Sequence, residues 1–124
     1  MAVTYDRIYA DEDGESHFET VEVALKEVDY APPADPVYLS ELEAATKVGV
    51  LMVSPGPAGD WHPTPVTQYL VVVSGEAEIT VSDGEKRRFK PGQVFLTADK
   101  TGKGHYSENV SSEPLVLMVI HLPD

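Results

Sequence analysis

Apolar and polar residues alternate along much of this chain in short runs, and a period of two residues is that of a strand buried on one face. Residues 16–25 alternate in this way. Residues 76–81 do the same, and every second side chain from Ala77 onward is predicted to face the interior. We therefore expect a β-strand in each of these two segments.

Clusters of turn-forming residues separate the apolar runs. The pairs Ser74-Gly75, Asp83-Gly84 and Pro91-Gly92 are typical of turns, and Asp-Gly is a strong hairpin signal. Residues 31–36 hold three prolines and are expected to form an extended connection. Residues 40–47 alone have helical composition, which leaves a short helix, a turn or a strand open for them. Further strands are predicted at residues 48–53, 64–74, 86–90, 94–97 and 115–122, and from His105 onward.

Short strands separated by turn signals every 8–12 residues or so are typical of an all-β sandwich or barrel. The chain has 124 residues, which corresponds to a single domain of ordinary size. Within it, residues 1–47 are expected to contribute an N-terminal strand and a proline-rich connection, and residues 48–122 the barrel core.

Composition narrows the chemistry that is available to the chain. There is no cysteine, so disulfides, thiolate metal ligands and a cysteine nucleophile are excluded. The net charge of −12 disfavours binding to nucleic acid, because such a surface repels phosphate. The N-terminus does not resemble a signal peptide, and the apolar runs are too short to span a bilayer. We expect a cytoplasmic protein that binds neither nucleic acid nor membrane.

The candidates for chemistry centre on the run DWHPTPVTQYLVVVSGE at residues 60–76, in which a histidine is followed by two prolines and then by an apolar strand. In an unbroken strand the side chains of His62, Thr64 and Gln68 would share one face. His105 opens a separate strand. Imidazoles from two strands, together with an oxygen donor, can converge on one divalent metal ion inside a barrel.

The spacing of this run resembles the first motif of the cupin family, whose members are small β-barrels of the double-stranded β-helix or jelly-roll type. Gly56 is followed after five residues by His62, Gln68 comes after the next five, and Gly75 after six more. This spacing agrees with that of the family motif throughout. In the family motif a second histidine stands at the position of Thr64 and a glutamate at that of Gln68.

A second motif of the family is matched less closely. Gly92 begins it, Ala98 stands at the position of the family's proline, and His105 arrives two residues late. Asn109 follows at the expected distance. The two motifs occur in the expected order with strand patterns between them, so the resemblance implies an all-β jelly-roll barrel over most of the chain.

The resemblance also implies a divalent metal ion, namely Zn, Fe, Mn or Ni, with His62, Gln68 and His105 as ligands. The carboxylate of the family's ligand set is missing here, and its absence weakens binding of a hard or borderline dication. A site without metal is therefore the alternative.

Four more residues are expected to line the pocket. Ser107 and Asn109 share the face of His105, Thr64 shares that of His62, and His121 lies in the final apolar strand. The chain is expected to bind a small oxygen-rich molecule, as a metal-dependent isomerase, lyase or dioxygenase. Two alternatives are a non-catalytic binding protein without metal and metal-free acid–base catalysis by a histidine.

A homodimer is the expected assembly. The family resemblance implies dimers, and the alternating residues 18–25 could pair with a neighbouring subunit.

Overall fold

Strands account for all of the regular secondary structure in residues 2–124, the part of the chain that the computed structural model describes. The strands are β1 (Val3–Ala10), β2 (Ser16–Val23), β3 (Lys26–Val28), β4 (Val37–Leu39), β5 (Lys47–Val53), β6 (Gly56–Pro57), β7 (Gln68–Ser74), β8 (Ala77–Val81), β9 (Lys86–Phe89), β10 (Val94–Thr97), β11 (His105–Asn109) and β12 (Leu115–His121). The described residues contain no helix that could cross a membrane.

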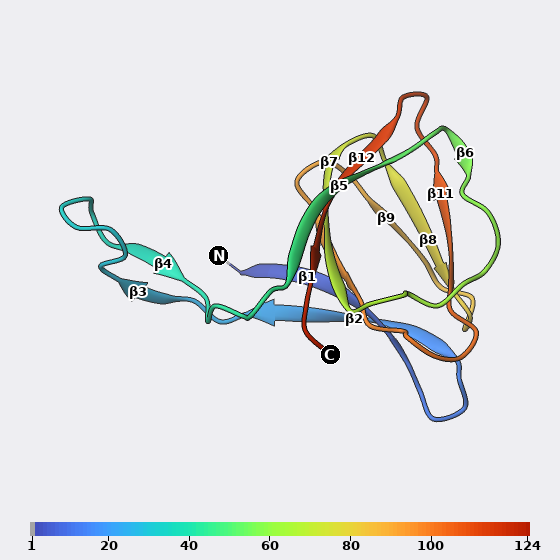
Figure 1. Cartoon of the computed structure of the whole chain (residues 1–124), viewed down its shortest axis with the longest axis horizontal. Helices are drawn as coiled ribbons and strands as arrows, with labels where there is room; N and C mark the ends of the chain where they lie inside the picture. Colours follow the sequence, from blue (N-terminus) through green and yellow to red (C-terminus); the bar gives the residue numbers. More distant parts are fainter. Residues whose placement is uncertain (1) are drawn as a thin grey trace.

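Two sheets form the walls of a barrel (Figure 1). The larger sheet has the strand order β2-β1-β10-β7-β12-β5, and the smaller has the order β6-β11-β8-β9. Neighbouring strands are antiparallel except for β1 and β10, which are parallel. The prediction of an all-β jelly-roll barrel is confirmed.

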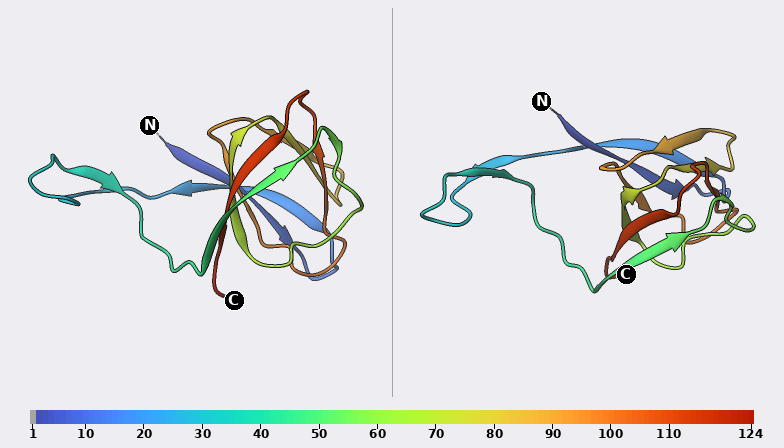
Figure 2. Two further views of the ribbon diagram at one scale, coloured as in Figure 1. Left: turned by 45° about the horizontal axis from the view of Figure 1, so that its top comes forward. Right: turned by 90° about the horizontal axis from the view of Figure 1, so that it is seen from above.

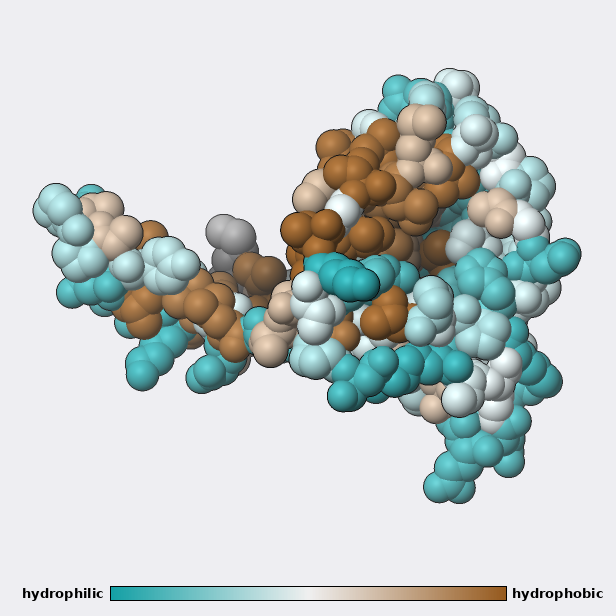
Figure 3. All heavy atoms as spheres, in the orientation of Figure 1, coloured by the Kyte–Doolittle hydropathy of each residue, from teal (hydrophilic) through white to brown (hydrophobic). Residues whose placement is uncertain are grey.

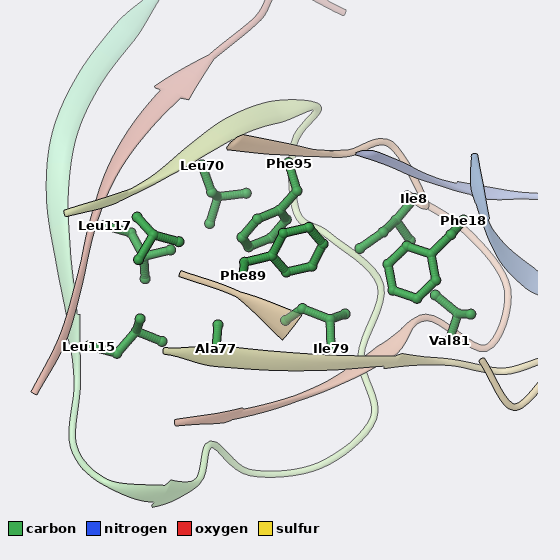
Figure 4. Close-up of a cluster of buried hydrophobic side chains, with 11 residues drawn as sticks. Ile8, Phe18, Leu70, Ala77, Ile79, Val81, Phe89, Phe95, Leu115 and Leu117 are labelled. Carbon is green, nitrogen blue, oxygen red and sulfur yellow. The ribbon is translucent and has the colours of Figure 1, made fainter. Parts of the chain in front are cut away.

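The hydrophobic core fills the space between the two sheets, and Figure 4 shows its side chains pointing inward from both. The alternation predicted for β8 is correct, because Ala77, Ile79 and Val81 are all buried. Ile8 from β1 and Phe18 from β2 belong to the same core. The N-terminal segment therefore shares the core of residues 48–122. The other core residues are Leu70, Val72, Phe89, Phe95, Leu115 and Leu117.

Strand β1 was not predicted from the sequence. It pairs with β10 on one side and β2 on the other, and Ile8 is completely buried. The same face of the strand also carries Asp6, whose carboxylate lies 3.1 Å from the Arg87 guanidinium. This mixture of polar and apolar residues on one face removes the alternation by which a strand is detected.

The β1–β2 hairpin is tied to the turn between β8 and β9 through His17. Its Nε2 lies 2.6 Å from Asp11 Oδ2, and its Nδ1 lies 2.8 Å from Asp83 Oδ2. The hydrogen bonds to Asp11 and Asp83 raise the pKa of His17. The pKa of Asp11 is lowered chiefly by His17, and that of Asp83 chiefly by the backbone N–H of Glu85 and then by His17.

Strands β3 and β4 form a separate two-stranded hairpin that projects away from the barrel, here called the arm (Figure 2). Residues 31–36 lie in the connection between β3 and β4 and turn the chain back, so the expectation of an extended connection is wrong. Residues 40–46 are irregular and mostly exposed, and no helix forms there. A helix this short is marginal in water without a face to pack on, and these residues have none.

Candidate functional site

A cavity of about 120 Å³ lies inside the barrel between the two sheets. Its walls are mainly apolar, and its polar side chains come from β7, β10 and β11 and from the segment before β7. Its lining includes Leu51, Val53, Leu70, Ala77, Ile79, Phe95, Leu115 and Leu117 as apolar groups and His62, Thr64, Gln68, Thr97, His105, Ser107 and Glu108 as polar ones.

The structure brings His62 and His105 together at this cavity. They form an isolated antiparallel bridge, in which His62 N donates to His105 O over 3.1 Å and His105 N donates to His62 O over 3.0 Å. The centroids of the two rings are 4.9 Å apart. Residues separated by more than forty positions in the sequence thus present their imidazoles side by side.

The approach of these two segments depends on Gly104. Its φ is +74°, and a Cβ built on it would lie 2.1 Å from the carbonyl carbon of His62. No other residue type fits there without moving the backbone. The glycine before His105 therefore makes room for the backbone of His62.

Each of the two rings is anchored through its Nδ1 atom. His62 Nδ1 lies 2.9 Å from Asp60 O, and His105 Nδ1 lies 2.6 Å from Asp99 Oδ2. Both partners are acceptors, so in the neutral imidazole each Nδ1–H donates and each Nε2 carries a lone pair. Both residues line the cavity, and the Nε2 lone pair of each ring is not used by Asp60 or Asp99, so it can accept a hydrogen bond or bind a metal ion.

Asp99 is a residue of this site that the sequence analysis missed, as it also missed Thr97 and Glu108 of the cavity lining. It is fully buried and hydrogen-bonded to His105, and its Oδ1 has no hydrogen-bond partner among the described residues. Burial of a carboxylate that is only half satisfied is unfavourable, so stability alone does not favour an acid here. A carboxylate behind a histidine instead fixes the orientation and tautomer of the ring. The sequence signal was weak: one acid, six residues before a histidine, in a polar loop.

The predicted strand over residues 64–74 is wrong at its start, because β7 begins at Gln68. Thr64 is flanked by prolines, and its buried hydroxyl donates to Val66 O over 2.7 Å and contacts the Thr97 hydroxyl at 2.9 Å. Gln68 Nε2 donates to Thr64 Oγ1 over 3.4 Å. These contacts occupy the threonine hydroxyl. Gln68 can then offer its Oε1 atom to a ligand, either to accept a hydrogen bond or to bind a metal ion.

The remaining predicted pocket residues divide into two groups. Ser107 lines the cavity, as Thr64 does. Asn109 and His121 do not. Asn109 is buried, but its amide donates to the carbonyls of Val53 and Glu113 and so holds the loop between β11 and β12. His121 lies at the end of β12 in register with Gln68, outside the cavity lining.

The donor set decides which metal ion fits. Residues 2–124 contain no group of three or more His, Cys, Asp or Glu side chains arranged to hold a metal ion. Two imidazole nitrogens with anchored Nδ1 atoms, together with the Gln68 amide oxygen, do fit an ion that accepts neutral nitrogen ligands. Imidazole suits Zn²⁺ and Ni²⁺ better than it suits Mn²⁺.

Fold and site together define a small jelly-roll barrel with a histidine-bearing cavity. The sequence profile of the cupin domain matches residues 49–121, and the chain therefore belongs to the cupin family. The resemblance found in the two motifs is thereby confirmed.

Individual relatives share 34% or less of their aligned residues with this chain. The chain is 34% identical over 79 residues to oxalate decarboxylase OxdC of Bacillus subtilis (strain 168). The aligned region covers 60% of this chain and 20% of that protein. The chain thus spans about one fifth of the length of this relative. A cupin 2 conserved barrel domain protein from Salinispora arenicola CNS-205 has a similar structure, with a TM-score of 0.51, 20% identity, and coverage of 82% of this chain and 76% of that one. A predicted oxalate decarboxylase from Thermotoga maritima gives a TM-score of 0.48 at 20% identity, covering 82% and 94% of the two chains.

Proposed function

We propose that this protein binds a small oxygen-rich molecule in the barrel cavity, and that a divalent metal ion held by His62, Gln68 and His105 takes part in that binding. The observation that supports the proposal is the anchoring through Nδ1 of two histidines that line one cavity, which leaves the Nε2 lone pair of each ring to a ligand. A metal-ligating histidine ordinarily donates its other ring N–H to a carboxylate or a carbonyl, as these two do.

The size of the cavity limits the ligand. A volume of about 120 Å³ is slightly smaller than the ~150 Å³ engineered cavity that accommodates benzene. A ligand of about six non-hydrogen atoms therefore fits. Its oxygen atoms would face the histidines and Gln68, and any carbon part would contact the apolar wall formed by residues such as Leu70 and Phe95.

The side chains of the site have separate parts in this proposal. Asp99 and the Asp60 carbonyl hold the two imidazoles in place. The hydrogen bond to Thr64 restrains the Gln68 amide. The surrounding apolar side chains exclude water and strengthen polar contacts to the ligand. A bound divalent ion would supply a Lewis acid for the ligand's oxygens.

Metal analysis of protein purified without a histidine tag tests the proposal. Titration with Ni²⁺ or Zn²⁺ should show one saturable site, and His62→Ala or His105→Ala should remove it. The matched control is His121→Ala, a histidine outside the cavity, which should bind like the wild type. Equal binding by all three variants would place the metal elsewhere and overturn the proposal.

Oxalate is the first ligand to test, because a sequence relative is an oxalate decarboxylase and the ion has six non-hydrogen atoms. In the presence of Zn²⁺ it should raise the melting temperature of the wild type, and the rise should be absent in His105→Ala. No stabilisation of the wild type by oxalate or other short carboxylates would remove small carboxylates from the proposed ligand class.

A second candidate is a site that binds its ligand without metal. The missing carboxylate ligand favours it, because two neutral imidazoles and a neutral amide leave the charge of a dication uncompensated. In that case the two Nε2 atoms accept hydrogen bonds directly from hydroxyl groups of the ligand. Stabilisation by ligand that persists in excess chelator distinguishes this candidate from the first.

A further inference from the structure

The turn between β1 and β2 (residues 11–15) lies against the loop between β10 and β11 (residues 98–104), which leads into His105 (Figure 1). Gly14 of the turn and Gly102 of the loop are in backbone contact, and a Cβ built on Gly102 would lie 2.7 Å from Gly14 Cα. Figure 3, in the same orientation, shows the turn as a hydrophilic projection at the lower right. The backbone before His105 is therefore packed on this turn through Gly102 and on His62 through Gly104.

Two hydrogen bonds hold the last residues of the loop on the hairpin. Lys103 N donates to Gly14 O over 2.9 Å, and the Ser16 hydroxyl donates to Gly104 O over 2.6 Å. Because Ser16 is fully buried, separation of the hairpin from the loop would leave polar atoms unpaired away from water. The position of His105 thus depends on the hairpin as well as on the strand that His105 begins.

His17 fixes the β1–β2 turn to the body of the barrel. Its two ring nitrogens face two different carboxylates, Asp11 in this turn and Asp83 in the turn between β8 and β9. The other oxygen of Asp11 accepts the backbone N–H groups of Asp13 and Glu15 over 2.9 and 3.0 Å. One carboxylate therefore both shapes the turn and binds His17.

Only the charged ring satisfies both carboxylates. A carboxylate accepts hydrogen bonds, the imidazolium donates one from each nitrogen, and a neutral imidazole donates from one nitrogen only. Loss of the second proton would leave a ring lone pair facing a carboxylate oxygen at 2.6 or 2.8 Å, which is a repulsive contact. The neutral ring therefore releases either Asp11 or Asp83. Either release loosens the end of the hairpin that contacts the β10–β11 loop.

His17 is the group of this cluster that changes charge near neutral pH. Its side chain is 28% exposed, so it exchanges protons with solvent. The hydrogen bonds to Asp11 and Asp83 raise the pKa of His17. Tyrosine, lysine and arginine side chains change charge only in alkaline solution, and carboxylates only in acid. The other titratable groups around the cluster are of these kinds: Tyr9 on β1, Arg87 on β9 near Asp83, and the Glu15–Lys103 ion pair near Asp11.

We infer that the charge on His17 regulates the ligand site: the imidazolium holds the β1–β2 turn on the β10–β11 loop, and the loop holds His105 beside His62. The site therefore binds its ligand more tightly while His17 is charged. Affinity for the ligand falls as the pH rises through the raised pKa of His17. The effect on affinity rests on the proposed function, whereas the movement of the loop depends only on the hairpin.

Zn²⁺ titrations of the wild type and His17→Asn, between about pH 6 and 8.5, test the regulation. Protons on His62 and His105 compete with Zn²⁺ equally in both proteins, so the ratio of their affinities isolates His17. We expect the wild type to bind at least about fivefold more tightly at the lower pH, and the ratio to approach one at the upper pH. Glu19→Gln is the matched control. It breaks the ion pair with Arg7 elsewhere on the same hairpin, and it should bind like the wild type throughout.

Amide chemical shifts test the movement of the loop without any ligand. In ¹H–¹⁵N spectra over the same pH range, the amides of Lys103, Gly104 and His105 should shift with the midpoint of the His17 ring, and this shift should be absent in His17→Asn. Such shifts in a protein that binds no Zn²⁺ would support the coupling and contradict the proposed function. Loop amides that do not follow His17, or an affinity ratio that stays constant with pH, would overturn the inference.

Discussion

Replacement of Gly104 by alanine tests how the two histidines are brought together. A left-handed conformation costs a residue with a Cβ about 1–2 kcal/mol. The new Cβ would also lie 2.1 Å from the His62 carbonyl carbon, so the two segments must separate. Loss of the paired backbone hydrogen bonds between His62 and His105 adds about 0.5–1.5 kcal/mol for each.

These contributions give a loss of about 2–5 kcal/mol in the free energy of unfolding for Gly104→Ala. The matched control is Gly84→Ala, because Gly84 also has a positive φ, +100°, but a Cβ there meets nothing within 4 Å. It should lose only the conformational part, about 1–2 kcal/mol. Urea denaturation measures both values.

The same pair of variants should differ in ligand binding. Gly104→Ala moves His62 away from His105 and should lose the Zn²⁺ site, whereas Gly84→Ala should keep it. Equal destabilisation of the two variants, with Zn²⁺ binding retained in both, would refute the argument that the contact at Gly104 creates the site.

Three other predictions concern the side chains of the site and of the His17 cluster. Asp99→Asn should weaken Ni²⁺ or Zn²⁺ binding about 10–100-fold, because His105 loses its fixed orientation. The melting temperature should stay equal or rise, because a buried charge is removed. Calorimetry measures both quantities, and a parallel loss of stability and binding would mean that Asp99 has a purely structural role. The pKa of His17 is raised, and the pKa values of Asp11 and Asp83 are lowered. The stabilisation by this cluster is therefore complete between about pH 4 and 6.5. It is lost as the pH rises through the raised pKa of His17, and also as the pH falls through the lowered pKa values of the two acids. The difference in melting temperature between wild type and His17→Asn should therefore shrink above that range, and a constant difference would contradict the assignment. Finally, competition titrations should rank Ni²⁺ and Zn²⁺ above Mn²⁺, and tighter binding of Mn²⁺ would indicate a carboxylate ligand that the proposal does not include.

Local sequence patterns predicted those strands in which each side chain faces either the core or the solvent. The hairpin of β8 and β9 followed from alternation and the Asp83-Gly84 turn, and the structure has both. The arm was not predicted, because its residues have no core to face and so produce no alternation. Residues 40–47, for which a helix, a turn or a strand was left open, form no helix despite their helical composition, because propensity without a packing surface does not decide a structure.

In the site, the spacing of the motifs identified residues but not their contacts. Thr64 is turned into a hydrogen-bonded bend by the prolines on either side, which a strand pattern does not reveal. Asp99 is buried only because the loop before β11 folds inward, and a lone acid in a polar segment gives no sign of that. Asn109 shares the strand face of His105, but its amide is taken up by the neighbouring loop.

The central claim is that His62 and His105 present Nε2 lone pairs to one cavity. Long-range ¹H–¹⁵N correlation spectra of the four histidine rings, recorded before and after addition of Zn²⁺, test it most directly. We predict that both rings carry their proton on Nδ1 in the neutral form, and that Zn²⁺ shifts their Nε2 signals while those of His17 and His121 stay in place. Shifts in only one of the two rings, or equal shifts in all four, would contradict a shared site.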